Sequence, residues 1–533
     1  MREHLATLVV SVSLCAALAL SARLAAQEQK EEKNEHHHYK LIDMGTFGGP
    51  SSLFSTPDSR VLNKRGTATG VADTPTPDPN CFFDCLVVHA FVWKNGVITD
   101  LGALPGGQSS FPYWVNDRGL IVGQSQNASI DPLTGVPQVR GVVWQKGQII
   151  DLGTLGGNAS NTISINSRGQ VLGAATNATP DPFANASMGA CLMLPTNSPC
   201  SGYTFAFNSL YTVSTTETHA FVWQDGLAHD LGTLGGPDSG PEMNNDRGEV
   251  VGWSYTNFLA NPSSGTPTVD PFIWSPEDGK MTDLGSFGGT FGSPFWLNNR
   301  GQVVGASNLA GDQTFHPFLW DRGKLNDLGT LGGYTGAAFM LNDAGEAVGY
   351  ADLPPTPLGC SGFSCIHHGF LWKDGVMTDL GALSDPCSRA LSINEDGQIV
   401  GVTSPCGGEF TRAFLWENGG PLVDLNSLIV NGSGLTVREG DFINDGGEIA
   451  GRAILPNGDV HAVLLIPCDE GHAGIEGCVY DTVDAENTVA VVQPVQSTNT
   501  FTAVTASAKL SPSETVKGSY SSMARRNHRL GRP

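Results

Sequence analysis

The heptad Asp-Leu-Gly-Thr-Leu-Gly-Gly occurs three times, and a glycine-rich stretch beside an acidic residue is one way to cradle a phosphate group. The copies are Asp151–Gly157, Asp230–Gly236 and Asp327–Gly333. A phosphate loop needs a following helix N-terminus and usually a lysine. The residues that follow these heptads have the pattern of a strand, with no lysine nearby. Because variants of the heptad recur in most units of a longer repeat, we interpret it as a structural joint.

Recurring histidines and aspartates raise the questions of metal binding and glycoside hydrolysis. The histidines lie in separate repeat units and need not converge, so a hydrogen bond that ties strands together is the favoured interpretation. The repeated aspartates, from Asp43 to Asp424, are equivalent, whereas a glycosidase needs two carboxylates in different environments. The sequence therefore predicts no catalytic, cofactor-binding or metal-binding residues. The motif histidines are His89, His219, His316, His368 and His461.

Apart from Cys15 near the N-terminus, the cysteines fall into pairs that are close in sequence. An even number of cysteines in an exported chain is typical of disulfides. Spacing alone leaves their connectivity open. The pairs are Cys81/Cys85, Cys191/Cys200, Cys360/Cys365, Cys387/Cys406 and Cys468/Cys478.

Composition and the N-terminal segment indicate an exported protein. The chain of 533 residues carries a formal net charge of −23, which argues against nucleic acid or an anionic membrane as partner. Residues 1–26 have the pattern of a signal peptide, and no later apolar run is long enough to span a membrane. Residues 27–38 form a charged linker in which we interpret His36–His38 as solvated spacer. We expect a secreted or periplasmic protein.

The elements that would position any site belong to a repeat of about 50 residues. Each unit contains four short strand-like segments: one that ends in Asn, one that ends in Val-Val-Gly or a variant, one with the pattern His-Ala-Phe-Val-Trp, and one that ends in Asp-Leu-Gly. Asn-Asp-Arg-Gly and related turns join the first two segments and lack the closing glutamate of a calcium loop. The Asn-ending segments end near Asn63, Asn116, Asn166, Asn244, Asn298, Asn342, Asn394 and Asn444.

The count of segments predicts how the repeat closes. The last unit lacks its fourth segment, and the stretch Tyr39–Gly45 supplies one before the first unit. A closed ring requires such an exchange, because it leaves no open edge between the two ends. We predict an all-β fold, a β-propeller of eight four-stranded blades over residues 39–467, closed by an N-terminal strand.

The ordered motifs His-Ala-Phe-x-Trp, Asp-Leu-Gly-Thr-Leu-Gly-Gly, Ile-Asn and Val-Val-Gly resemble those of the bacterial HAF extracellular repeat proteins. The resemblance covers all of the units. It implies export and repetition, and it implies no established activity. Units that depart from the pattern have His-Pro-Phe, His-Gly-Phe or Arg-Gly-Val instead of His-Ala-Phe, and Ala382–Pro386 replaces one glycine joint.

Function is expected on the face that bears the connections between the second and third segments, because their lengths vary. In one of them, Trp253, Tyr255 and Phe258 are candidates for stacking on a ligand such as a glycan or a peptide. We predict a non-enzymatic protein that binds or scaffolds through this face, with no cofactor; the alternative is a propeller enzyme, a glycoside hydrolase or lyase, acting on extracellular carbohydrate. Residues 468–485 should form a small cysteine-bounded extension, and residues 486–533 a disordered low-complexity tail.

Overall fold

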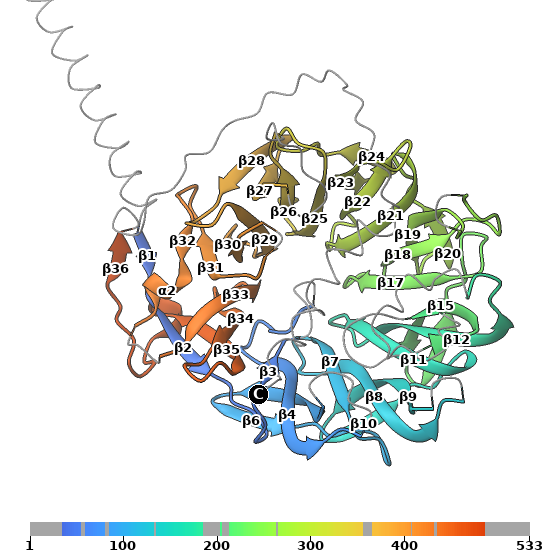
Figure 1. Cartoon of the computed structure of the whole chain (residues 1–533), viewed down its shortest axis with the longest axis horizontal. Coiled ribbons are helices and arrows are strands. Elements are labelled where there is room, and N and C mark those ends of the chain that lie inside the picture. Colours follow the sequence, from blue (N-terminus) through green and yellow to red (C-terminus); the bar gives the residue numbers. More distant parts are fainter. Residues whose placement is uncertain are drawn as a thin grey trace, which may run out of the picture.

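The computed structural model describes residues 35–54, 59–79, 85–132, 135–184, 203–204, 213–262, 265–354, 365–406, 408–430 and 434–484. The described chain forms a ring of eight four-stranded antiparallel sheets around a central axis (Figure 1). The predicted fold class, an eight-bladed propeller, is confirmed. The predicted signal peptide and C-terminal tail lie outside the described residues.

Each blade has four strands in sequence order except blade 8, and one parallel bridge between Val269 and Phe291 joins blades 4 and 5 into a single eight-stranded sheet. Blade 1 comprises β3 (Ser52–Leu53), β4 (Ala68–Pro77), β5 (Leu86–Lys94) and β6 (Val97–Asp100), and blade 2 comprises β7 (Ser110–Val115), β8 (Ile121–Ile130), β9 (Pro137–Gln145) and β10 (Gln148–Asp151). Blade 3 comprises β11 (Gly156–Ile165), β12 (Val171–Pro180), β15 (Thr216–Gln224) and β16 (Leu227–Asp230), and blade 4 comprises β17 (Ser239–Asn244), β18 (Val250–Tyr255), β19 (Val269–Ser275) and β20 (Lys280–Asp283).

The second half of the ring continues the pattern. Blade 5 comprises β21 (Gly288–Leu297), β22 (Val303–Leu309), β23 (Phe315–Asp321) and β24 (Lys324–Asp327), and blade 6 comprises β25 (Gly336–Leu341), β26 (Ala347–Asp352), β27 (His367–Lys373) and β28 (Val376–Gly381). Blade 7 comprises β29 (Cys387–Ile393), β30 (Ile399–Ser404), β31 (Arg412–Trp416) and β32 (Val423–Asp424), and blade 8 comprises β33 (Thr436–Ile443), β34 (Ile449–Ile454), β35 (Val460–Pro467) and β2 (Tyr39–Asp43).

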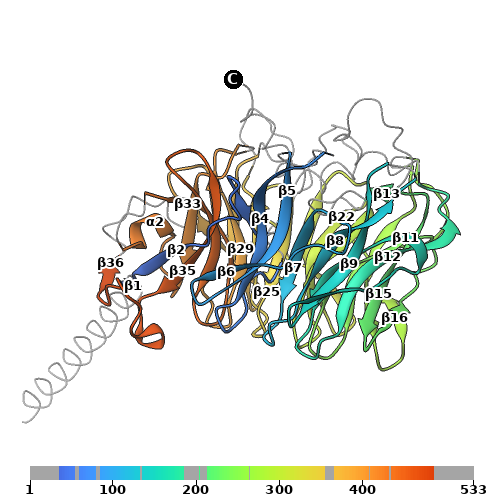
Figure 2. The same ribbon diagram turned by 90° about the horizontal axis from the view of Figure 1, so that it is seen from below.

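The first strand of each blade lies nearest the axis and the fourth lies at the rim (Figure 1). The order of the strands defines two faces of the disc, which Figure 2 shows edge-on. The turn face carries the tight turns between first and second strands and between third and fourth strands. The loop face carries the second-to-third connections and the glycine joints between blades.

The repeated glycine of the second strand lies where neighbouring groups leave no room for a side chain. Phe91, Phe221 and Phe272, each from a third strand, are at most 1% exposed. A Cβ added to Gly173, in the neighbouring second strand, would lie 2.8 Å from the ring of Phe221. The same conflict occurs in blades 1, 4, 5 and 7. The glycine of Val-Val-Gly is therefore required for two reasons: a backbone carbonyl of the first strand, 2.2 Å from the added Cβ at Gly173, and the aromatic ring both occupy the space of its side chain.

The N-terminal strand closes the ring as predicted. β2 pairs antiparallel with β35, from Tyr39 opposite Pro467 to Asp43 opposite Val463 (Figure 1). Just before it, β1 (Glu35–His37) pairs with β36 (Thr482–Asp484). His36 is 1% exposed and its Nδ1 lies 2.7 Å from Glu417. The interpretation of His36–His38 as solvated spacer is wrong for His36, because a glutamate on a different blade pairs with it.

A belt of eight asparagines joins all of the blades near the turn face. Each side chain donates from Nδ2 to the backbone carbonyl of its counterpart in the next blade, at 2.9–3.1 Å. The last bond, Asn444 to Asn63, joins residues 381 positions apart. The member in blade 4 is Asn245, not Asn244 as the sequence suggested. The members are Asn63, Asn116, Asn166, Asn245, Asn298, Asn342, Asn394 and Asn444.

Side chains fill the axis of the ring at the level of the inner strands. Trp114 from blade 2 and Trp296 from blade 5 stack with ring centroids 5.7 Å apart. They are 4% and 8% exposed and share one hydrophobic cluster with Met243, Met340 and Phe442. Because blades 2 and 5 are not neighbours, this stack braces the ring across its axis.

Two of the predicted disulfides are present in the described chain: Cys387–Cys406 and Cys468–Cys478, with Cα atoms 5.2 and 5.4 Å apart. Cys85 and Cys365 are also disulfide-bonded. Their expected partners, Cys81 and Cys360, and the pair Cys191/Cys200 lie outside the described residues. The remaining elements are β13 (Tyr203–Thr204), β14 (Val213–Ser214), α2 (Leu425–Leu428) and the 3-10 helix η3 (Glu470–His472).

Candidate functional site

The motif histidines pair with the motif aspartates within each blade, as the hydrogen-bond interpretation predicts. A histidine near the start of the third strand contacts the aspartate that ends the fourth strand, on the loop face. The Nδ1-to-carboxylate distances are 2.8 or 2.9 Å for His89–Asp100, His219–Asp230, His316–Asp327, His368–Asp379 and His461–Asp43. Arginine takes the place of histidine in blades 2 and 7, as Arg140–Asp151 and Arg412–Asp424.

Blade 4 breaks this pattern with an acidic pair. Asp270 stands where the other blades have a base, and the aspartate that ends the fourth strand is Asp283. Burial, together with the charge of Asp283, raises the pKa of Asp270 to about 6. Its Oδ1 is buried without a hydrogen-bond partner. Blade 4 therefore lacks the basic side chain, histidine or arginine, that every other blade places opposite this aspartate.

A second departure lies at the joint that enters blade 4. Two residues after the paired glycines, Ser109 at the blade 1–2 junction accepts a hydrogen bond from the backbone N–H of Val88, at 3.3 Å. At the blade 3–4 junction the same position is Asp238, whose Oδ1 accepts from the backbone N–H of Thr218 at 2.7 Å. A serine performs this task with one oxygen. The aspartate adds a second oxygen, Oδ2, which has no partner.

Asp181, which is close to Asp238, lacks the side-chain hydrogen-bond donor that the equivalent aspartate in blade 2, Asp131, has. Asp131 follows β8 and Asp181 follows β12, at equivalent places in blades 2 and 3. Asp131 accepts a hydrogen bond from the side chain of Asn158 in the next blade. The residue equivalent to Asn158 is Pro237, which has no donor to offer. Asp181 Oδ2 is consequently buried without a partner.

Burial and mutual repulsion perturb both carboxyls. Asp238 is 0% and Asp181 is 7% exposed. Burial, and then the charge of Asp181, raises the pKa of Asp238 to about 8, against the hydrogen bond from Thr218. Burial also raises the pKa of Asp181, and the charge of Glu217 adds to this effect. Asp238 is therefore mostly protonated at neutral pH, a state that is costly for a carboxyl.

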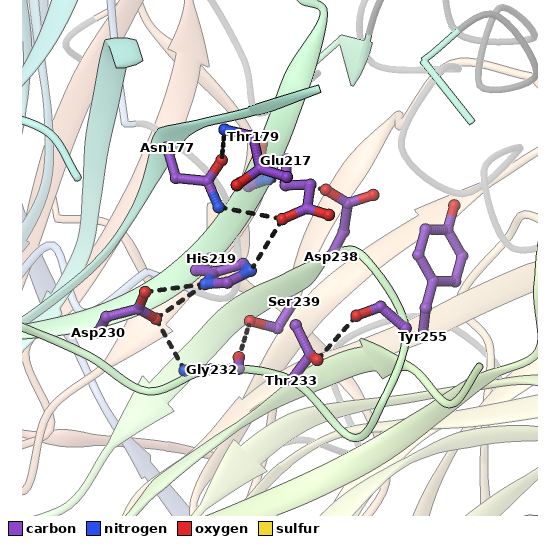
Figure 3. A network of polar contacts seen from close by, with 12 residues as sticks. Asn177, Thr179, Glu217, His219, Asp230, Gly232, Thr233, Asp238, Ser239 and Tyr255 are labelled. Carbon is purple, nitrogen blue, oxygen red and sulfur yellow. Dashed lines mark hydrogen bonds and ion pairs between the residues drawn. The ribbon is translucent and has the colours of Figure 1, made fainter. Parts of the chain in front are cut away.

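Glu217 and His219 lie between the buried Asp238 and the more exposed Asp230 (Figure 3). Glu217 accepts from Asn177 Nδ2 at 3.2 Å and lies 3.9 Å from His219 Nε2. Side-chain exposure rises outward, from 13% at Glu217 to 15% at His219 and 42% at Asp230. Burial lowers the pKa of His219, but the hydrogen bond and charge of Asp230 outweigh it and raise this pKa overall. We call Asp181, Glu217 and Asp238, with His219, the carboxylate cluster.

The predicted stacking aromatics lie beside this cluster but differ in exposure. Tyr255 is 3% exposed; its backbone N–H donates to Asp238 O at 3.0 Å, and its ring lies 6.0 Å from that of Trp253. Trp253 is half-buried, with its ring over Gly240 of the inner strand. Both therefore pack the loop face. Phe258 is 55% exposed and the adjacent Leu259 is 77% exposed. Stacking on a ligand stays a prediction for the three aromatics, of which Phe258 is the most exposed.

A second buried polar group lies between blades 6 and 7, and its members satisfy one another. Arg389 Nε donates to His367 Nε2 at 3.3 Å, and the guanidinium lies over the rings of Tyr350 and Phe410, at 5.4 and 5.8 Å. Burial and the charge of Arg389 lower the pKa of His367 to about 3, which keeps the imidazole neutral. This arrangement has the character of a packed structural contact.

The described residues contain no group of three or more His, Cys, Asp or Glu side chains placed to hold a metal ion. No helix in the described part of the chain is long and apolar enough to cross a membrane. The sequence-based search for carboxylates considered only the repeated aspartates and missed Asp181, Glu217 and Asp238. The available signal was the change from Asn158-Ala159 to Pro237-Asp238 after an otherwise identical heptad.

No protein-family model and no curated protein sequence matches the chain. Among solved structures it is similar to an acylaminoacyl peptidase from Pyrococcus horikoshii, with 11% identity and a TM-score of 0.38 over 80% of this chain and 59% of the peptidase. It is also similar to an ulvan lyase of family PL25, with 9% identity and a TM-score of 0.30 over 80% of this chain and 95% of the lyase. A third similar structure is TolB from Acinetobacter baumannii, with 14% identity and a TM-score of 0.27 over 46% of this chain and 59% of TolB. The chain thus spans less than two thirds of the peptidase. These overlaps carry no inference about activity.

Proposed function

We propose that the protein is an exported, non-enzymatic member of the HAF type of repeat proteins that binds a cationic group of an extracellular ligand at the carboxylate cluster. The observation that carries the proposal is the pair of buried, unpartnered oxygens on Asp181 and Asp238. The pattern of a signal peptide and the disulfides support export.

The chemistry of the cluster favours an ammonium group. Two unpartnered oxygens on different carboxyls suit a compact cation whose N–H donors point in several directions. A lysine side chain presents such a group on an apolar stem, which Phe258 and Leu259 can contact. Because both oxygens are buried, the loop face has to open locally for the ligand to reach them.

Calorimetric titration of the mature protein tests the proposal. The probes are a short peptide with one lysine and the same peptide with norleucine, which keeps the stem without the ammonium. We expect binding at least 10-fold tighter for lysine. The pKa of Asp238 is about 8, and below this pH the cation must displace a proton from the carboxyl. The affinity for the lysine peptide should therefore increase with pH, by up to about 10-fold per pH unit, and become constant above pH 8.

Asp238→Asn supplies the variant and Asp131→Asn the matched control at the equivalent blade 2–3 junction. The first should abolish the preference for lysine and its pH dependence, and the second should leave both unchanged. Equal affinity for lysine and norleucine peptides would refute the proposal. Preference for glucosamine oligomers over the lysine peptide would move the ligand class from peptide to glycan.

One observation favours a second candidate, an enzyme acting on extracellular carbohydrate. A protonated Asp238 beside a second carboxyl resembles the acid and base of a glycosidase, whose two carboxyls also differ in pKa. Release of reducing ends or of unsaturated products from a panel of polysaccharides, followed with wild type and Asp238→Asn, tests this candidate. Turnover that disappears in the variant would establish it.

A further inference from the structure

The turn face, opposite the carboxylate cluster, carries a concentration of positive charge in blades 1–3. Five exposed cations lie in consecutive turns of these blades and form no ion pair within the described chain: Arg65, Lys94, Arg118, Lys146 and Arg168. Two nearby cations are paired, Arg60 with Asp117 at 2.9 Å and Lys64 with Asp445 at 2.7 Å. Asp225 is the exposed acid among the same turns. We call the five cations the basic sector.

The rest of the turn face has the opposite character. Asp246, Glu277 and Asp278 are exposed in the turns of blade 4. In blades 6 and 7 the corresponding turns expose Asp374, Glu395 and Asp396. Blade 5 repeats the cations as Arg300 and Arg322, but it lies between acidic neighbours, and Arg322 is paired with Asp321 at 3.1 Å. A chain with net charge −23 therefore places five exposed, unpaired cations in consecutive turns of blades 1–3, whereas the exposed, unpaired cations of blades 4 and 5 are Lys280, Arg300 and Lys324.

We propose that the basic sector binds an anionic polysaccharide that bears carboxylate or sulfate groups. Guanidinium and ammonium groups bind carboxylate and sulfate groups. Because the five cations are spread over three blades, they suit an extended polymer whose negative charges are also spaced along its length. Nucleic acid is a poorer fit, because its charge density of one per ~1.7 Å meets strong repulsion from the rest of the protein. The sector also lacks exposed aromatic rings for base stacking.

This inference is independent of the proposed function, since it concerns the opposite face. Together the two would make the propeller a bridge between a cationic and an anionic partner. The basic sector is formed by exposed turn residues, so its side chains can be changed without disturbing the blades.

Binding of polygalacturonate oligomers, measured by biolayer interferometry with the mature protein, tests the inference. Neutral pullulan and single-stranded DNA are the comparison ligands. The sector variant is Arg118→Glu with Lys146→Glu. The matched control is Arg300→Glu with Arg322→Glu, which makes the same charge change at the same repeat positions in blade 5. Lys146 and Arg322 even share a positive φ, 51° and 47°.

We expect the sector variant to weaken polygalacturonate binding at least 10-fold, the control to weaken it less than 2-fold, and salt to weaken it in wild type. Both variants should melt at the wild-type temperature. Equal losses in the two variants would refute a localised site. So would equal binding of pullulan, while tighter binding of DNA would replace polysaccharide with nucleic acid as the partner.

Discussion

Asp238→Asn should stabilise the protein at neutral and alkaline pH, although it changes a fully buried residue. The wild-type carboxyl has a pKa of about 8 in the folded protein and 3.8 as its ordinary value. A group with a raised acid pKa binds more protons when folded, so its unfavourable contribution grows as pH rises from about 4 to about 8. The variant removes this contribution.

The expected magnitude follows from the size of the shift. The ordinary pKa of 3.8 lies about three pH units below pH 7, and each unit corresponds to about 1.36 kcal/mol. The carboxyl therefore lowers the free energy of unfolding by about 4 kcal/mol at pH 7 and by nearly 6 kcal/mol above pH 9. Asparagine retains an acceptor for Thr218 and places a donor near Asp181, as Asn158 does for Asp131. For a ring of this size, the gain at pH 7 corresponds to about 4–8 °C in melting temperature.

Thermal unfolding of wild type and variant at pH 4, 7 and 8.5 measures the effect. The difference should be near zero at pH 4 and largest at pH 8.5. Asp238→Ser, which installs the residue found at Ser109, should behave in the same direction. Asp131→Asn is the control, and it should not gain stability at any pH, because its carboxylate already has a donor. If Asp238→Asn is less stable than wild type at pH 8.5, or gains equally at pH 4, the reasoning is refuted.

Other predictions concern the ring. Deleting Tyr39–Gly45 removes buried Tyr39, Leu41 and Met44, at about 1.5–3 kcal/mol each, so the melting temperature should fall sharply; an unchanged curve would contradict closure. Asn444→Ala, which breaks the closing bond of the belt and bonds within its turn, should cost about 2–4 kcal/mol in chemical denaturation, against less than about 1 kcal/mol for exposed Asn457→Ala, which loses only its bonds to Asp459. The hydrogen bond to Asp43 raises the pKa of His461, so its stabilisation is complete below about pH 6.5 and is lost at higher pH; wild type should lose more stability than His461→Gln between pH 5 and 8.5. Non-reducing peptide mapping should find all five local disulfides, and free thiols at Cys191 and Cys200 would contradict that pairing.

Much of the ring was predictable because each unit repeats the same local physics. Turns after Asn63 and its counterparts, the glycines opposite the buried phenylalanines and the strand Tyr39–Asp43 are all visible as recurring residue types at fixed spacing. Repetition also allowed the phosphate-loop and glycosidase interpretations of the motif residues to be set aside. The pairing of His461 with Asp43 follows from the same logic, since the first and last units share one blade.

The candidate site was not predictable in this way, because it depends on what faces each side chain across a junction. The sequence by itself determined the number of blades, the closing strand and the general place of the variable loops. Only the tertiary structure decided that Asn158 satisfies Asp131 whereas Pro237 leaves Asp181 without a donor, and that Asp238 is buried beside it. Local spacing encodes strands and turns, but a missing hydrogen-bond partner is a property of two segments that meet only when the blades pack together.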